Sequence, residues 1–243
     1  MPVVDLGDVS IHYQEAGSGP LALVFCPGVD TERGREFAAN FEAWRQHFDR
    51  VLTWDPRGLG GSSTTRKYSL PLYASDLARL MDRLDVQRAV VMGMLWGGIL
   101  TQQFALDYPE RCAGLVLDST TSEVNVQASE RWYQMAENAK QDTKVNQESR
   151  ESLVAAYRSV AGLREHPLTP RLKGITCPVL VVAGVQVGFN KRDEVASAIM
   201  ANSLPNATLR LLEGVGAGII RQRPDQFRQM VVDFCRSQGV INR

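Results

Sequence analysis

Histidine is scarce in this sequence, which has three in 243 residues: His12, His47 and His166. Histidine is the side chain whose ordinary pKa suits proton transfer near neutral pH, so few positions can supply a general base. We expect His12 to lie in an N-terminal hairpin, His47 to end a surface helix, and His166 to lie where a helical insertion ends. Each is therefore interpreted as an ordinary surface or core residue.

The four cysteines lack the spacing of a metal site or of a disulfide framework. None belongs to a C-x-x-C pair and none has a neighbouring histidine. They are Cys26, Cys112, Cys177 and Cys235. We therefore predict structural thiols and no metal, and nothing in the sequence indicates a cofactor.

Net charge and long apolar runs are missing too. Lys+Arg and Asp+Glu each number 27, so no net field attracts phosphates, and nucleic acid is not an expected partner. No stretch approaches the roughly 20 apolar residues that a membrane span needs, and the N-terminus has no basic region before an apolar run. We expect a soluble, cytoplasmic monomer or homodimer that does not contact membranes.

Short apolar runs alternate with helical patterns along most of the chain. Hydrophobic residues make up 44% and charged residues 22%, which is ordinary for a globular protein. The expected buried strands are 21–25, 50–54, 88–92, 113–117 and 179–183. The helices expected around them are 37–48, 72–84, 98–108, 193–203 and 225–237. This alternation predicts a single α/β domain over residues 1–243, built on a doubly wound, parallel sheet.

Two segments depart from this alternation. Residues 3–13 alternate apolar and polar residues around Gly7 and Asp8, which predicts a β-hairpin. Residues from about 122 to 168 are helical and polar, with Trp132 and Tyr133 side by side. We interpret this second segment as a helical cap over the carboxyl edge of the sheet.

Three motifs resemble those of the α/β hydrolase fold family, in particular its small esterase-like and lactonase-like members. Residues 93–98, G-M-L-W-G-G, resemble the nucleophile elbow G-x-S-x-G-G between a strand and a helix. Residues 55–62, D-P-R-G-L-G-G-S, resemble a structural turn of the family, and residues 25–29, F-C-P-G-V, stand in place of its His-Gly loop. The resemblance implies a mostly parallel, eight-stranded sheet with a short helical cap.

The resemblance also implies three catalytic positions, and none of them carries a residue of a Ser-His-Asp triad. Leu95 stands at the serine position, Val187 at the acid position after the seventh strand, and Ala217 at the histidine position after the eighth. Some family members carry the acid after the sixth strand, where Asp118 stands. An acid only orients a histidine that must itself move the proton, and no histidine is available.

Asp118 and Cys26 each keep two interpretations. Asp118 is either a strand-end residue that caps Ser119 or Thr120, or a polar group of a ligand pocket. Cys26 ends a strand at the expected mouth of that pocket. To act as a nucleophile its thiol would need a nearby base or cation that lowers its pKa, and the sequence shows none.

Backbone N–H groups survive the loss of the catalytic side chains. The resemblance implies an oxyanion hole formed by the N–H of Trp96 and that of Gly28 or Val29. Because Leu95, Val187 and Ala217 are all apolar, we predict a dry pocket for a hydrophobic small molecule. The expected pocket residues are Cys26, Met94, Asp118, Trp132, Tyr133 and Phe189.

Three functions remain open, and the first is favoured. It is a cofactor-independent, non-hydrolytic enzyme that folds a hydrophobic substrate, such as a biosynthetic intermediate, for a cyclisation or pericyclic step. The second is an esterase-like or lactonase-like hydrolase that engineering or inactivation has stripped of its triad. The third is a protein that binds a small molecule without turnover. The family motifs around the three triad positions are otherwise intact, which favours deliberate removal of the triad. Pro27 and Gln222 depart from the residues usual in the family, which favours natural divergence.

We predict that the purified protein hydrolyses p-nitrophenyl acetate no faster than bovine albumin, because no base lies beside a nucleophile. Leu95→Ser alone should stay inactive, since triad residues act as a unit. Adding Val187→Asp and Ala217→His should give weak esterase activity. Saturable turnover by the unaltered protein, with a single serine labelled by a fluorophosphonate, would contradict the prediction. Equal activity of the single and triple variants would show that the triad positions are misassigned.

Overall fold

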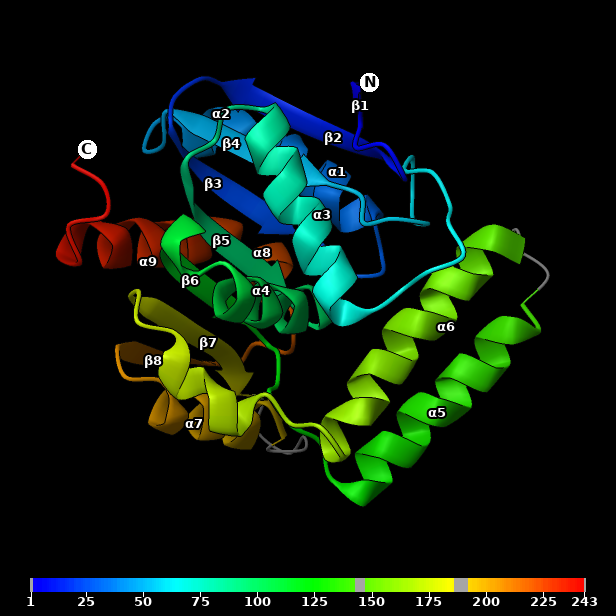
Figure 1. Cartoon of the computed structure of the whole chain (residues 1–243). Helices are drawn as coiled ribbons and strands as arrows, with labels where there is room; N and C mark the ends of the chain where they lie inside the picture. Colours follow the sequence, from blue (N-terminus) through cyan, green and yellow to red (C-terminus); the bar gives the residue numbers. More distant parts are fainter. Residues whose placement is uncertain (1, 143–146, 186–191, 243) are drawn as a thin grey trace.

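Eight strands form a sheet in the order β1-β2-β4-β3-β5-β6-β7-β8. The computed structural model describes residues 2–142, 147–185 and 192–242 (Figure 1). The strands are β1 Val3–Asp5, β2 Ser10–Gly17, β3 Leu21–Cys26, β4 Arg50–Trp54, β5 Arg88–Met94, β6 Cys112–Asp118, β7 Val179–Val185 and β8 Ala207–Glu213. The pairs β1–β2 and β2–β4 are antiparallel, and the other neighbours are parallel. The predicted eight-stranded, mostly parallel sheet is confirmed.

Helices cover both faces of the sheet. They are α1 Glu32–Ala38, α2 Phe41–Arg45, α3 Leu70–Arg83, α4 Trp96–Asp107, α5 Val126–Lys140, α6 Gln147–Ala161, α7 Arg192–Ser203, α8 Ile219–Gln222 and α9 Pro224–Ser237. Buried residues of α3, α4 and α7 share one core cluster with one face of the strands. Those of α1, α2 and α9 share a second cluster with the other face. Strands buried on both faces explain the continuous apolar runs of the sequence.

The single helix predicted over residues 37–48 is wrong, because two short helices, α1 and α2, occupy this region. Asn40 lies between them with φ −108° and ψ 13°, outside the helical region. Its side-chain amide donates a hydrogen bond of 2.9 Å to the carbonyl oxygen of Glu36. Asparagine side chains of this kind compete with helical backbone hydrogen bonds, which accounts for the break.

The predicted cap segment contains the antiparallel helices α5 and α6, which lie together at one side of the sheet (Figure 1). Ala136 and Ala139 of α5 pack against Val154 of α6. The two ends of the segment meet, because Leu168 N–H donates a hydrogen bond of 2.8 Å to Ser122 O. The segment therefore leaves the α/β core and returns to it at one place.

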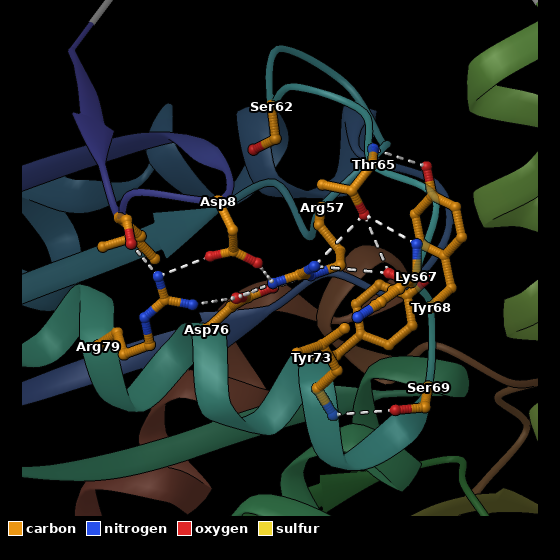
Figure 2. Close-up of polar contacts among 12 residues, drawn as sticks. Asp8, Arg57, Ser62, Thr65, Lys67, Tyr68, Ser69, Tyr73, Asp76 and Arg79 are labelled. Carbon is orange, nitrogen blue, oxygen red and sulfur yellow. Dashed lines mark hydrogen bonds and ion pairs between the residues drawn. The ribbon is translucent and has the colours of Figure 1, made fainter.

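A buried ion pair holds the D-P-R-G turn against α3, as Figure 2 shows. The Arg57 guanidinium donates to both carboxylate oxygens of Asp76, at 2.5 and 2.6 Å. The side chain of Arg57 is 1% exposed and that of Asp76 is 0% exposed. Asp8, which is half exposed, contacts Arg57 at 3.1 Å and Arg79 at 2.7 Å. The network thus connects the N-terminal hairpin, the turn after β4 and α3.

The same turn anchors the cap. Ser152 of α6 donates a hydrogen bond of 2.8 Å to Arg57 O, and its hydroxyl lies 2.9 Å from that of Tyr73. Gly58 has φ +72°, and a Cβ there would lie 2.7 Å from Cβ of Ser152. A side chain at position 58 would therefore be strained and would push α6 away.

In the part of the chain that the structure describes, no helix is long and apolar enough to cross a membrane.

We predict that Asp76→Asn lowers the free energy of unfolding by about 3–5 kcal/mol, because it leaves the buried charge of Arg57 without its counter-charge. Asp8→Asn removes the half-exposed partner of the same arginine and should cost under about 1 kcal/mol. Guanidinium unfolding of both variants, followed by circular dichroism, measures the difference. Similar losses of unfolding free energy in the two variants would show that the buried Arg57–Asp76 pair matters no more to stability than the half-exposed contact with Asp8.

Candidate functional site

The strand-to-helix turn between β5 and α4 has the geometry expected of a nucleophile elbow. Leu95, at its apex, has φ 53° and ψ −119°, a strained conformation for a residue with a branched side chain. A Cβ on Gly97 would overlap the carbonyl oxygen of Cys26, and one on Gly93 would overlap that of Gly97. The two glycines therefore permit an approach of backbone to backbone that no other residue allows.

Leu95 provides no reactive atom at this apex. Its side chain is half-buried and packs against the core cluster on the α1–α9 face of the sheet. Its backbone N–H donates to Asp118 O at 3.1 Å, and its carbonyl accepts from the Thr120 hydroxyl at 2.6 Å. The backbone N–H and C=O of Leu95 are thus fixed by the last residue of β6 and by the segment that follows it.

The loop of Gly28, predicted to supply one donor of the oxyanion hole, lies against the first turn of α4. Gly28 has φ +93°, and a Cβ on it would lie 3.5 Å from Gly97 N. Within the described residues, the N–H groups of Trp96 and Val29 donate to no protein acceptor. Donors without a protein partner are available to a ligand oxygen, and that of Trp96 lies at the N-terminus of α4. Their role as an oxyanion hole stays a prediction.

The loop that follows β8 brings Ala217 to the same region. Ala217 is exposed, and the side-chain amide of Gln222 donates to its carbonyl at 3.0 Å. Gly218 N–H donates to Ser119 Oγ at 3.1 Å, and a Cβ on Gly218 would lie 3.0 Å from Met94 Sδ. The loop of Ala217 therefore contacts both the end of β5 and the end of β6.

Two predicted site residues, Val187 and Phe189, lie outside the described residues. Their place relative to Leu95 and Ala217 stays a prediction.

Asp118 is 1% exposed and joins the end of β6 to the loop after β8. Its carboxylate accepts from the Ser119 hydroxyl at 2.8 Å and from the N–H groups of Ile219 and Ile220 at 3.4 Å. Burial raises its pKa to about 6, against the lowering effect of these hydrogen bonds. The contact with Ser119 agrees with the strand-end interpretation, and this geometry leaves Asp118 little access to a ligand.

The sequence predicts Ser119 only as a possible partner of Asp118. Ser119 has φ +50°, and its hydroxyl links Asp118 to Gly218 N–H. It therefore helps to hold the loop of Ala217 beside Leu95. A serine directly after a strand-end aspartate is the sequence signal for the contact with Asp118. The contact with Gly218, which is distant in the sequence, cannot be deduced from it.

Cys26 is fully buried, and burial raises the pKa of its thiol to about 11. Trp54 and Thr101 lie beside the sulfur and lower that pKa by a smaller amount. The thiol is therefore protonated near neutral pH. A nucleophilic role for Cys26 is not supported.

Of the three aromatic residues predicted near the pocket, Trp96 and Trp132 are engaged in packing and Tyr133 is exposed. Trp96 is buried; its ring meets Tyr73 edge to face at 5.0 Å, and its indole N–H donates to Ser159 of α6 at 2.9 Å. Trp132 packs on Tyr157, with ring centroids 5.6 Å apart, whereas Tyr133 is 43% exposed. Ser159, which fixes the Trp96 indole from the cap, was not singled out from the sequence.

Met94, another predicted pocket residue, lines a cavity of about 290 Å³ on the α1–α9 face of the sheet. Phe25, Phe37, Trp44 and Ile220 form its apolar lining. Glu36 and Arg221, which form an ion pair at 2.8 Å, also line it. This cavity lies on the face that Leu95 packs against, near the lower end of the usual size of ligand sites.

The three histidines lie in other surroundings. His12 of β2 is buried, and its Nδ1 lies 2.7 Å from the carboxylate of Asp55 in the turn after β4. His47 follows α2, and burial lowers its pKa. His166 is exposed. Within the described residues, neither His47 nor His166 is hydrogen-bonded to the side chain or backbone of Leu95, Ala217 or Asp118.

Comparison with known proteins identifies relatives of hydrolytic activity. A sequence model described as "alpha/beta hydrolase fold" matches residues 22–169, more than half of the chain. The 3-oxoadipate enol-lactonase 2 of Acinetobacter baylyi is 24% identical over 261 aligned positions, which cover 92% of each chain. The crystal structure of a hydrolase from Pseudomonas aeruginosa superposes with a TM-score of 0.78 at 24% identity, covering 96% of this chain and 97% of that one.

A higher identity is confined to a short stretch. The poly(3-hydroxyalkanoate) depolymerase of Ectopseudomonas oleovorans is 51% identical over 73 residues, which are 30% of this chain and 26% of that protein. The match thus spans about a quarter of the depolymerase.

We predict that the stability gained from Asp118 depends on pH. Because its folded pKa of about 6 lies above the ordinary 3.8, the contribution is complete below about pH 4 and is lost as the pH rises through 6. The unfolding free energy of the wild type minus that of Asp118→Asn should therefore fall between pH 4 and pH 7.5, by about 3 kcal/mol at most.

Urea unfolding at four pH values in this range measures that difference. Asp225→Asn, at a carboxylate on the surface of α9, is the matched control for the loss of one charge. A difference for Asp118→Asn that stays constant with pH would contradict the prediction.

Proposed function

We propose a non-hydrolytic function, on the premise that this chain belongs to the α/β hydrolase fold family. In this proposal the protein binds a hydrophobic small molecule that carries a carbonyl group, and it promotes a cofactor-independent step such as a cyclisation. A cytoplasmic location, as a monomer or homodimer without a nucleic-acid or membrane partner, is part of the same proposal.

The observation that carries the proposal is the strained elbow with leucine at its apex. A non-glycine residue at φ 53° costs about 1–3 kcal/mol. Such strain is usual where a turn presents a reactive side chain, yet leucine has no reactive atom. What the turn still positions is the N–H of Trp96, beside the loop of Gly28 and Val29. We infer that these backbone donors are the part of the site in use.

Two N–H groups aimed at one carbonyl oxygen stabilise negative charge that develops on it. One such donor is worth about 3 kcal/mol of transition-state stabilisation in hydrolases. Holding a flexible substrate in a reactive conformer contributes several kcal/mol more, roughly 7–11 in the best cases. The apolar surroundings of Leu95, and the cavity of about 290 Å³ beside Met94, support a hydrophobic substrate.

A second candidate is a hydrolase that has lost its triad. It is favoured by the names of the relatives, which include a depolymerase and an enol-lactonase. Such a protein would keep the elbow as an inherited feature without turning over a substrate. Binding without turnover, the third candidate, shares the pocket with the first and differs in the absence of a product.

A ketone probe tests the donors directly. We expect 2-octanone, 2-decanone or 2-dodecanone to bind saturably, and the carbonyl stretching frequency of the bound ketone to lie below its value in water, because preorganised N–H groups polarise the bond. Isotope-edited infrared difference spectra with a ¹³C-labelled carbonyl measure this shift.

Ala217→Trp should abolish the shifted band. Ala217 is exposed in the loop beside Met94, so the added indole ring should compete with the ketone for space there. Gln226→Trp, at an exposed position of α9, is the matched control for an added tryptophan and should keep the band. Absence of saturable binding by all three ketones, or an unchanged band in Ala217→Trp with preserved melting temperature, would place the functional site elsewhere.

A further inference from the structure

Cys112 and Cys177 are far apart in the sequence and neighbours in the fold. Cys112 begins β6, and Cys177 lies two residues before β7. The two strands are parallel neighbours with Leu115 opposite Val179, and Leu115 N–H donates to Pro178 O at 2.9 Å. Both cysteines pack against the same core cluster on the α3–α4–α7 face. Their side chains therefore lie on the same side of two adjacent strands.

The two thiols are free, and each lies near enough to shift the pKa of the other. Cys112 is 2% exposed, and its sulfur also lies 3.7 Å from Tyr108 O. Cys177 is only partly buried. Cys177 is therefore the more accessible of the two thiols to an oxidant in solution.

The surroundings favour the thiolate at Cys177. The contact between the two thiols lowers the pKa of Cys177 and raises that of Cys112. The guanidinium of Arg88, which donates to Cys112 O at 3.1 Å, adds a smaller lowering effect at Cys177. Because the thiolate is the nucleophile, Cys177 is the thiol expected to react first.

We propose that Cys112 and Cys177 are a redox-active dithiol, which hydrogen peroxide oxidises to an intramolecular disulfide. The Cys177 thiolate attacks one peroxide oxygen, the O–O bond breaks, and the departing hydroxide takes up a proton to become water. This leaves a sulfenic acid on Cys177. The Cys112 sulfur then attacks the Cys177 sulfur; the S–O bond breaks, and the hydroxyl leaves with the Cys112 proton as a second water. Two thiols are oxidised and one peroxide is reduced to two waters.

The remaining cysteines serve as internal controls. Cys26 and Cys235 are fully buried, and burial raises their pKa to about 11 and about 12. Neither is in hydrogen-bonding contact with another cysteine in the part of the chain that the structure describes. They should stay reduced under conditions that oxidise the pair.

The experiment starts from fully reduced protein treated with a small molar excess of hydrogen peroxide. Titration with a thiol reagent after unfolding should fall from four thiols to two, and dithiothreitol should restore four. Peptide mapping under non-reducing conditions should identify a single crosslinked pair, Cys112–Cys177. Because this measurement uses the unaltered protein, it decides the proposal even if a variant fails to fold.

Variants then assign the order of the two steps. In Cys112→Ser, dimedone should label Cys177, because its sulfenic acid has no partner thiol. In Cys177→Ser, no disulfide should form, whereas the matched control Cys26→Ser should still lose two thiols. Four thiols remaining in the unaltered protein, a disulfide between another pair, or oxidation of Cys177 beyond the sulfenic acid without a crosslink would overturn the proposal.

Discussion

The close contact between the turn after β5 and the loop after β3 is the constraint on which the rest of the site depends. Gly97 has no room for a Cβ against the carbonyl of Cys26, and Gly93 has none against Gly97. This contact fixes the direction in which α4 begins, and with it the N–H groups of its first turn. The backbone of Leu95 is then held by Asp118 O and by the Thr120 hydroxyl. The site is therefore positioned mainly by backbone contacts.

A chain of polar contacts connects this turn to the loop of Ala217. Asp118 accepts from Ser119 and from the first N–H groups of α8, and Ser119 accepts from Gly218. Burying a carboxylate is costly unless hydrogen bonds satisfy it, and these contacts supply them. Because these hydrogen bonds occupy its carboxylate, Asp118 stabilises the loop after β8 and has little access to a ligand.

The cap is attached to the core through two hydroxyl groups of α6. Ser152 bonds to the D-P-R-G turn, which the buried Arg57–Asp76 pair holds, and Ser159 bonds to the Trp96 indole. Trp96 thus connects the candidate oxyanion hole to the cap. Its backbone N–H is the candidate donor, and its ring is held by Ser159 of α6. A shift of α6 would therefore act on Trp96, the residue that supplies this N–H group.

The sequence by itself determined the class of fold, and at two described positions, 95 and 217, it carries side chains that cannot transfer a proton. Continuous apolar runs and glycine-rich turns are local signals, and a side chain without a proton acceptor is inert in any fold. Local signals could not place the break at Asn40, the partner of Ser159, or the contact of Cys112 with Cys177. Each of these depends on atoms that are distant in the sequence and meet only when strands pair and helices pack. The cysteines show this most clearly, because their spacing in the chain gives no sign of a pair. The parallel pairing of β6 and β7 brings the start of β6 close to the residues that precede β7.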